Sequence, residues 1–354
     1  MKKLFNVQMV GSILLLLTIF LSSCKQDLNV VSPTSDEQIV SEKIDALDMQ
    51  GVKVENGMLH FENLEALNKA TELLKKSNFA SLQAWSQSQN FKSLAILKDE
   101  FNTQLSKATT EEEIKELAFR NSDIFELLPD SSFRINNPYA NLFPFLNRES
   151  MLMIGNALCK YDKNGAIIVF DGNLDKMRNA VITKITEKEQ GVVVISNQNS
   201  RLQTRAACTK GNDSGMQYGD SGRRAKVIFS QFWLPTPNPS GFTFTFRSII
   251  NVQTFAQKRT LRVYFDYSTE QTLRFQSNLF VPTPIRGSTS SQPFFFDETL
   301  IGVQQSLSFI RTVREWVNVQ NYEALLNVES RFLDIDYFYS NRGGVNFEFH
   351  CSNP

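Results

Sequence analysis

After residue 240, apolar and polar residues alternate along one stretch of the chain after another. Phenylalanines alternate with threonines over Phe242–Phe246, and the same two-residue period recurs in Leu261–Tyr267, Leu333–Tyr339 and Val345–Cys351. Successive side chains of a β-strand point to opposite faces, so this pattern predicts strands with one buried and one solvated face. Phenylalanine is also over-used, with 29 residues against 8 tyrosines and 3 tryptophans. We therefore expect the C-terminal half to form an antiparallel β-sandwich packed with aromatic rings.

The preceding part of the chain shows helical and mixed patterns instead. Asn56-Gly57 separates two short apolar segments and predicts a hairpin, because both residues readily adopt positive φ. From residue 63 to about 128, apolar residues recur at helical spacing, and Thr110 with Glu113 matches the capping-box pattern. Between residues 151 and 195, short apolar segments predict strands around one further helix. The expected fold class is α+β, with a helical N-terminal region, a mixed middle and an antiparallel β-sandwich C-terminal domain.

The N-terminus has the order of a secretory signal. Two lysines precede an apolar run from Val10 to Leu21, which is shorter than the roughly 20 apolar residues of a membrane-spanning helix. The run ends in Leu-Ser-Ser followed by Cys24, which resembles a bacterial lipobox, where signal peptidase II cuts before the cysteine and lipid is attached to it. An ordinary secretory signal with a chance cysteine is the alternative. The resemblance implies a lipid anchor at Cys24 and a membrane as partner.

The segment after the signal is polar and carries no sustained apolar period, as expected of a tether. Lys25 stands where, by resemblance to sorting signals, an aspartate would favour the inner membrane, so we expect an outer-membrane location on its periplasmic or surface face. Removing the signal would leave 35 basic and 37 acidic residues, a net charge of −2, which gives no overall attraction to nucleic acid. The expected parts are a signal peptide over 1–23, a tether over 24–45, an α+β domain over 46–200 and a β-sandwich domain over 201–354.

Three further cysteines are available for a disulfide, which the bacterial envelope permits. Cys208 lies near the start of the C-terminal half and Cys351 near its end, so a bond between them would close that half into one long loop. The alternative is that Cys159, Cys208 and Cys351 are all buried free thiols, because connectivity cannot be read from sequence.

Several segments resemble uncharacterised lipoproteins of gut Bacteroidota. The signal and tether are followed by a hairpin of the form Val-x-Val-x-Asn-Gly-x-Leu-x-Phe over Val52–Phe61, and then by a helical segment. The segment Met153–Asn156 with its following hairpin, and the Arg-Ala-Lys-Val-Ile sequence at Arg224–Ile228, are also similar to elements of those proteins. The resemblance implies an envelope location. It implies no activity and no catalytic residues.

Two sequence features suggest catalysis or metal binding and have simpler explanations. Gly219-Asp220-Ser221-Gly222 resembles the nucleophile segment of serine proteases, but a triad needs a histidine base and the chain has only His60 and His350. A turn rich in glycine explains the same residues. His350 and Cys351 are neighbours on one expected strand and so point to opposite faces, which disfavours a shared zinc ion. We expect no metal and no cofactor.

Two further features are candidates for binding or catalysis. Asp334 and Asp336 share one face of a strand at roughly 6–7 Å, near the carboxyl separation of inverting glycosidases, although any solvated strand face carries such residues. Phe294, Phe295 and Phe296 are consecutive, so they cannot all point into a core, and at least one is expected to be exposed or covered by another element.

The sequence favours a lipid-anchored envelope protein that binds a glycan, a peptide or another envelope protein without catalysis. A glycan-acting polymer hydrolase that uses Asp334 and Asp336 is the first alternative. A surface-assembly subunit, in which the sandwich donates or accepts a strand, is the second.

Overall fold

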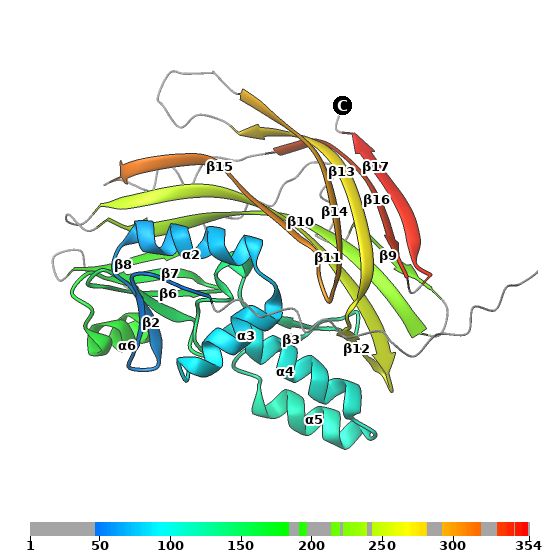
Figure 1. The fold of residues 1–354 in the computed structure, drawn as a ribbon, viewed down its shortest axis with the longest axis horizontal. Coiled ribbons are helices and arrows are strands. Elements are labelled where there is room, and N and C mark those ends of the chain that lie inside the picture. Colours follow the sequence, from blue (N-terminus) through cyan, green and yellow to red (C-terminus); the bar gives the residue numbers. More distant parts are fainter. Residues whose placement is uncertain are drawn as a thin grey trace, which may run out of the picture. The chain divides into compact units, whose positions relative to one another are not determined.

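The computed structural model describes residues 47–183, 191–196, 214–219, 222–238, 243–281, 292–319, 331–342 and 344–352. Its fold is α+β with a β-rich C-terminal region, which confirms the expected class (Figure 1). The first elements are β1 (Val52–Glu55) and β2 (Met58–Phe61), which pair as the predicted hairpin. Asn56 and Gly57 have φ angles of 51° and 72°, as the Asn-Gly turn requires.

An N-terminal sheet extends this hairpin in the order β1-β2-β5-β6-β7-β8. The added strands are β5 (Met151–Ile154), β6 (Ala157–Asp162), β7 (Gly165–Val169) and β8 (Val192–Ser196), and α6 (Leu174–Thr183) connects the last two. The pair β2 and β5 is parallel, while the other pairs are antiparallel. The predicted mixed middle of the chain is therefore confirmed.

Helices fill the predicted helical region. They are α2 (Leu64–Lys76), α3 (Phe79–Ser88), α4 (Leu94–Lys107) and α5 (Glu111–Arg120). A side chain caps the N-terminus of each helix, and Thr110 with Glu113 forms the predicted capping box of α5. A short hairpin of β3 (Phe125–Leu127) and β4 (Phe133–Ile135) follows, and then a single 3₁₀ turn, η1 (Ala140–Leu142).

The C-terminal region contains two antiparallel sheets. The inner sheet has the order β12-β11-β10-β9, with β15 also paired to β11; its strands are β9 (Ser214–Tyr218), β10 (Arg223–Pro237), β11 (Phe244–Thr260), β12 (Val263–Asp266) and β15 (Ser308–Val319). The outer sheet has the order β14-β13-β16-β17; its strands are β13 (Thr269–Val281), β14 (Gln292–Gln304), β16 (Arg331–Asn341) and β17 (Asn346–Ser352). Rings from both sheets meet between them, for example Phe229 with Phe275 at 5.8 Å between centroids, so the predicted sandwich is confirmed.

The inner sheet is buried on both faces, which the alternating pattern did not predict. On β11, Ile250 and Val252 belong to the cluster inside the sandwich, whereas their neighbour Ile249 belongs to a cluster with residues of the helical region. A polar residue on the same face as Ile249, Gln257, is buried too, at 1% exposure. The face that a two-layer sandwich would leave in water is here covered by the N-terminal region. One hydrophobic cluster thus spans both predicted domains, and the boundary at residue 200 stays a prediction.

The strand alternation predicted over Leu261–Tyr267 is shorter than expected. Leu261 has a φ of 49° and is 43% exposed, so it belongs to the turn between β11 and β12. A branched side chain is rare in this left-handed conformation, and the tight antiparallel connection explains why it occurs here.

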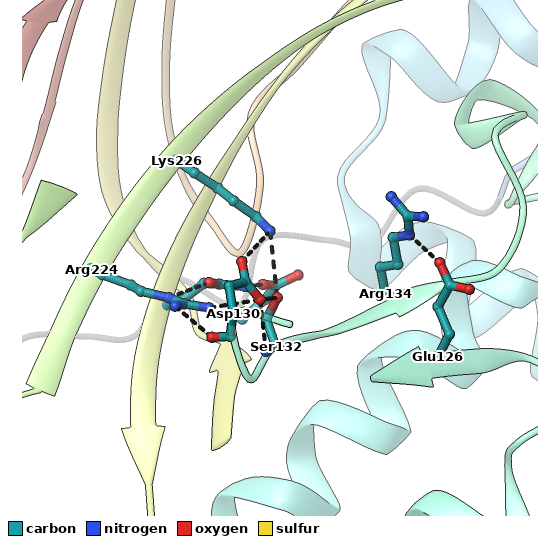
Figure 2. A network of polar contacts seen from close by, with 8 residues as sticks. Glu126, Asp130, Ser132, Arg134, Arg224 and Lys226 are labelled. Atoms are coloured by element: carbon teal, nitrogen blue, oxygen red, sulfur yellow. Dashed lines mark hydrogen bonds and ion pairs between the residues drawn. The ribbon is translucent and has the colours of Figure 1, made fainter. Parts of the chain in front are cut away.

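A buried charged network connects the N-terminal hairpin β3–β4 to the inner sheet, and we call it the charged seam. Its members are Lys98, Asp130, Ser132, Arg224, Lys226, Gln257 and Asp266. Asp130 lies in the turn between β3 and β4 and meets two buried cations of β10, Arg224 at 3.5 Å and Lys226 at 3.4 Å (Figure 2). Arg224 is 1% exposed, and its guanidinium also covers the Tyr264 ring at 3.6 Å.

The charged seam continues to helix α4. Arg224 donates to Gln257 at 2.8 Å, and Gln257 donates to Asp266 at 2.9 Å. Lys98 of α4 completes the chain with an ion pair to Asp266 at 2.7 Å. Burial by itself would raise the pKa of Asp130, but hydrogen bonds from Ser132 and the positive charges nearby outweigh it and lower that pKa.

We predict that Asp130→Ala destabilises the protein strongly. The substitution leaves Arg224 and Lys226 buried without their shared carboxylate, which costs about 3 kcal/mol of unfolding free energy. Chemical denaturation at pH 7 measures the loss. Glu116→Ala removes the exposed partner of Arg120 and is the control, with an expected cost below about 1 kcal/mol.

The stability of wild type and of Asp130→Ala should also depend differently on pH. A lowered pKa means that ionised Asp130 stabilises the fold at neutral pH, and that this contribution is lost as the pH falls below the ordinary value of 3.8. The gap between wild type and Asp130→Ala should therefore narrow in acid. Equal stability of the two proteins at pH 7 would show that the seam does not hold the layers together.

Candidate functional site

A cavity of about 690 Å³ lies between the helices and the inner sheet. We call it the interlayer groove. One wall consists of helices α2, α3 and α4 and the segment 140–145. The other consists of strands β10, β11 and β15, the end of β14 and residues 305–306. Its deep residues are apolar and buried, including Leu82, Leu234 and Ile249. The volume is in the range of ligand pockets in proteins, roughly 300–1,000 Å³.

An arginine fixes one end of the interlayer groove. Arg247 of β11 donates through Nε to Glu315 of β15 at 2.5 Å and through Nη1 to Asn68 of α2 at 2.9 Å. These bonds connect both walls of the groove. Because the guanidinium is planar and its donors have fixed directions, the spacing of the three elements is set at this end.

A chain of hydrogen bonds fixes the other end of the groove. Asn102 of α4 donates to Oε1 of Gln305 at 2.9 Å, and Nε2 of Gln305 donates to Oδ1 of Asp99 at 2.7 Å. Burial raises the pKa of Asp99 above its ordinary value, and the hydrogen bond from Gln305 only partly offsets this. Within the described residues, no lysine or arginine forms an ion pair with Asp99.

A further polar atom of the groove has no partner. Oδ1 of Asn141, in the 3₁₀ turn η1, is shielded from solvent and accepts no hydrogen bond from any described residue. A buried acceptor without a donor costs free energy, so such atoms are rare and often mark places where a ligand or water binds. Because Oδ1 of Asn141 is shielded from solvent, the acceptor that a ligand in the groove can reach is the carboxylate of Asp99.

The phenylalanines singled out in the sequence lie on β14, an edge strand of the outer sheet. Phe295 is 61% exposed and Phe296 is 2% exposed. This confirms that the consecutive phenylalanines do not all point into the core. The side chain of Phe294 lies outside the described residues. Ile301 and Val303 share the outward face of β14 with Phe295 and are 68% and 74% exposed. These three residues form an exposed apolar row.

Both aspartates are residues of β16 in the outer sheet, and Asp336 lies on its outward face. Asp336 of β16 is opposite Gln276 and His350 in the strand register, and its neighbour Tyr337 points into the sandwich. Asp334 shares the register face of Asp336, while its side chain lies outside the described residues. Asp336 does not line the interlayer groove.

The remaining predicted sites are only partly covered by the structure. Cys24, Cys208, Asp220 and Ser221 lie outside the described residues, as do the side chains of His350 and Cys351, so the lipid anchor and the Cys208–Cys351 bond stay predictions.

The other histidine and the remaining cysteine have structural surroundings. His60 hydrogen-bonds through Nδ1 to Glu55 at 2.7 Å in the N-terminal hairpin. Cys159 is a buried free thiol, and burial raises its pKa to about 12. Across the described part of the chain, no group of three metal-ligating side chains gathers. None of the described helices is both long and apolar enough to cross a bilayer.

Sequence reasoning missed the groove residues. Asp99 and Gln305 are 206 positions apart, and each looks like an ordinary surface residue in its own segment. Asn141 lies three residues after Pro138, in a segment through Leu146 whose sequence predicts a short helix. No local pattern signals that these polar groups share a cavity, because the fold alone brings them together.

Comparisons with known proteins give a distant likeness among solved structures. No model of a known protein family matches the chain, and no curated protein matches it. Among solved structures it is similar to a crystal structure of a DUF4848 family protein from Bacteroides thetaiotaomicron, with 16% identity and a TM-score of 0.31 over 85% of this chain and 100% of that one.

Proposed function

We propose that this chain is a lipid-anchored protein of the bacterial outer membrane that binds a ligand in the interlayer groove without catalysing a reaction. The observation that carries the proposal is the groove itself, a ligand-sized cavity with polar groups fixed at both ends. The lipobox-like sequence at Cys24 supports the anchor, and the polar segment that follows supports a tether.

The acidic residues of the groove favour binding over hydrolysis. Glycoside hydrolysis needs two carboxyl groups on opposite sides of the scissile bond, one of them protonated. Of the acidic residues that line the groove, Glu72 is paired with Lys75 and Glu315 with Arg247, which leaves Asp99. Asp336 does not line the groove, so the hydrolase alternative, which needs Asp334 and Asp336 together, has weaker support.

A second candidate function is assembly through the edge strand β14. An edge strand offers unpaired backbone groups to another strand, and exposed apolar side chains make such pairing favourable. The exposed apolar row of Phe295, Ile301 and Val303 is the observation that favours it. Asp297 and Glu298 in the middle of the strand oppose it, since charges on an edge strand disfavour pairing.

The anchor is tested by Cys24→Ser. Wild-type protein should sediment with outer membranes and resist extraction by salt. The variant should be lost from the outer membrane, because it either stays at the inner membrane with its signal uncut or becomes soluble after cleavage at another site. Metabolic labelling with an alkyne fatty acid should mark wild type only. A variant that still sediments and labels as wild type does would exclude a lipid on Cys24.

The groove is tested with soluble protein that begins after Cys24. Thermal unfolding is followed with neutral oligosaccharides, acidic oligosaccharides, neutral and basic hexapeptides, and fatty acids. We expect at least one class to raise the melting temperature, because a ligand that binds only the folded state stabilises it. Thr312→Trp places an indole at the exposed rim of the groove and should abolish the shift.

Thr103→Trp is the matched control, since Thr103 is also exposed but does not line the groove. It should leave the thermal shift unchanged. If no class shifts the melting temperature, or if both variants retain the full shift, the groove is not the ligand site.

Assembly is tested by sedimentation equilibrium of the same soluble protein. If β14 pairs with another strand, the wild type should associate as its concentration rises. A double substitution, Ile301→Lys with Val303→Lys, should hold it monomeric, because two charges replace the apolar row. If the wild-type protein stays monomeric up to millimolar concentration, self-assembly through β14 is excluded.

A further inference from the structure

One carboxylate in the lining of the interlayer groove has no partner of opposite charge. Each basic residue of the lining already forms an ion pair with a carboxylate: Lys75 with Glu72, Lys98 with Asp266 and Arg247 with Glu315. Among the described residues, no lysine or arginine is left to pair with Asp99. The charge that the groove leaves uncompensated is therefore negative.

The carboxylate of Asp99 also keeps one oxygen open. Its Oδ1 accepts from Nε2 of Gln305 at 2.7 Å, and the amide oxygen of Gln305 is held by Asn102 at 2.9 Å. Within the described part of the chain no donor reaches Oδ2, and this oxygen is not shielded from solvent as Oδ1 of Asn141 is. A ligand in the groove can contact Oδ2 without displacing a hydrogen bond of the protein.

The surroundings of Asp99 favour a positive charge beside it. Burial is the main cause of its raised pKa, and the negative charge of Glu100 raises that pKa more than the positive charge of Lys98 lowers it. The ammonium of Lys98 lies 2.7 Å from Asp266 and 5.1 Å from the centroid of the Phe255 ring, so it is already bound elsewhere. A carboxylate that is partly removed from water and lacks a counter-ion is stabilised by a cation that enters the groove.

The kind of cation follows from the atoms that are available. A calcium or magnesium ion needs about six oxygen ligands, whereas Asp99 offers one open oxygen in a lining whose deep residues, such as Leu82 and Ile249, are apolar. A guanidinium pairs best with both oxygens of a carboxylate, and Gln305 occupies one of them. A primary ammonium is a compact charge that can donate to a single oxygen.

We propose that the interlayer groove binds an apolar ligand that carries one primary ammonium group, and that this ammonium donates a hydrogen bond to Oδ2 of Asp99. This inference rests on the proposed function and names the chemical class of its ligand. The apolar body of the ligand packs on side chains such as Leu82, Ile249 and Phe79. The site is a binding site, and no bond of the ligand is made or broken in it.

Three matched compounds test the charge of the ligand. At pH 7, 4-phenylbutylamine, 4-phenylbutanol and 4-phenylbutyrate share one apolar body and carry a positive, a neutral and a negative head group. In isothermal titration of the soluble protein, the amine should bind at least about tenfold more tightly than the alcohol, because a charge-assisted hydrogen bond is stronger than a neutral one. The carboxylate should bind more weakly than the alcohol, because it meets a like charge at Asp99.

Asp99→Asn tests the assigned contact. It should reduce the preference for the amine over the alcohol to less than about threefold, and it should leave the affinity for the alcohol nearly unchanged, because the amide is neutral. Asp175→Asn makes the same substitution at an exposed position of α6 and should keep the full preference. Asp99→Asn should unfold at the same temperature as wild type or higher, because it removes a partly buried charge while its amide oxygen can still accept from Gln305.

The outcomes distinguish this inference from the proposed function. If the three compounds bind equally well and Thr312→Trp blocks all of them, the ammonium inference fails and the groove remains a binding site. If the preference for the amine survives in Asp99→Asn, another group holds the ammonium and the assigned contact is wrong. If none of the three binds at millimolar concentration, the ammonium inference fails, and the thermal unfolding panel decides separately whether the groove binds a ligand.

Discussion

Two buried cations share one carboxylate at the junction between the β3–β4 hairpin and the inner sheet, and the arrangement of layers depends on this contact. Arg224 and Lys226 project from β10 on the face opposite Ala225 and Val227, which pack inside the sandwich. Without Asp130 these cations would be dehydrated and uncompensated, at a cost of several kcal/mol. Covering the inner sheet therefore requires that the turn between β3 and β4 places Asp130 against these two cations. Lys98 and Asp266 extend the same requirement to α4, so that helices and sheet have one favourable relative position.

The interlayer groove follows from this way of joining the layers. Polar contacts hold the walls at separate places, Arg247 at one end and the Asn102–Gln305–Asp99 chain at the other. Ordinary apolar contact would bring the two layers together along their whole length, because close packing is favourable everywhere. Polar bridges of fixed length leave space where no side chain fills it. The half-buried charge of Asp99 lowers stability, as its raised pKa shows, and residues of this kind are more common at binding sites than in structural cores.

Local features of the sequence predicted the helices, strands and turns. The contacts between the layers could not be predicted from them. The Asn56-Gly57 turn, the Thr110–Glu113 capping box and the sandwich strands all depend on neighbours within a few residues, and all are confirmed. β11 departs from the pattern because a second layer covers it, and small polar residues such as Thr245 and Thr254 are buried through hydrogen bonds that no local rule specifies. The sequence did not predict the candidate site, for the same reason. Phe295 and Asp336 stand in sequence patterns that can be recognised locally. The surroundings of Asp99 depend on Gln305, which is 206 positions away in the sequence.

Val303 connects the two surfaces that the structure offers. It is the last member of the exposed apolar row of β14, and it also lines the rim of the interlayer groove. Phe295 lies eight residues earlier on the same strand, roughly 26 Å away at the rise of an extended chain. A strand that paired along β14 would reach the groove rim, and a polymer longer than the groove would leave it along the same row. Ligand binding and assembly through β14 therefore compete for Val303, so a protein that uses one of these surfaces with a long partner has the other partly covered.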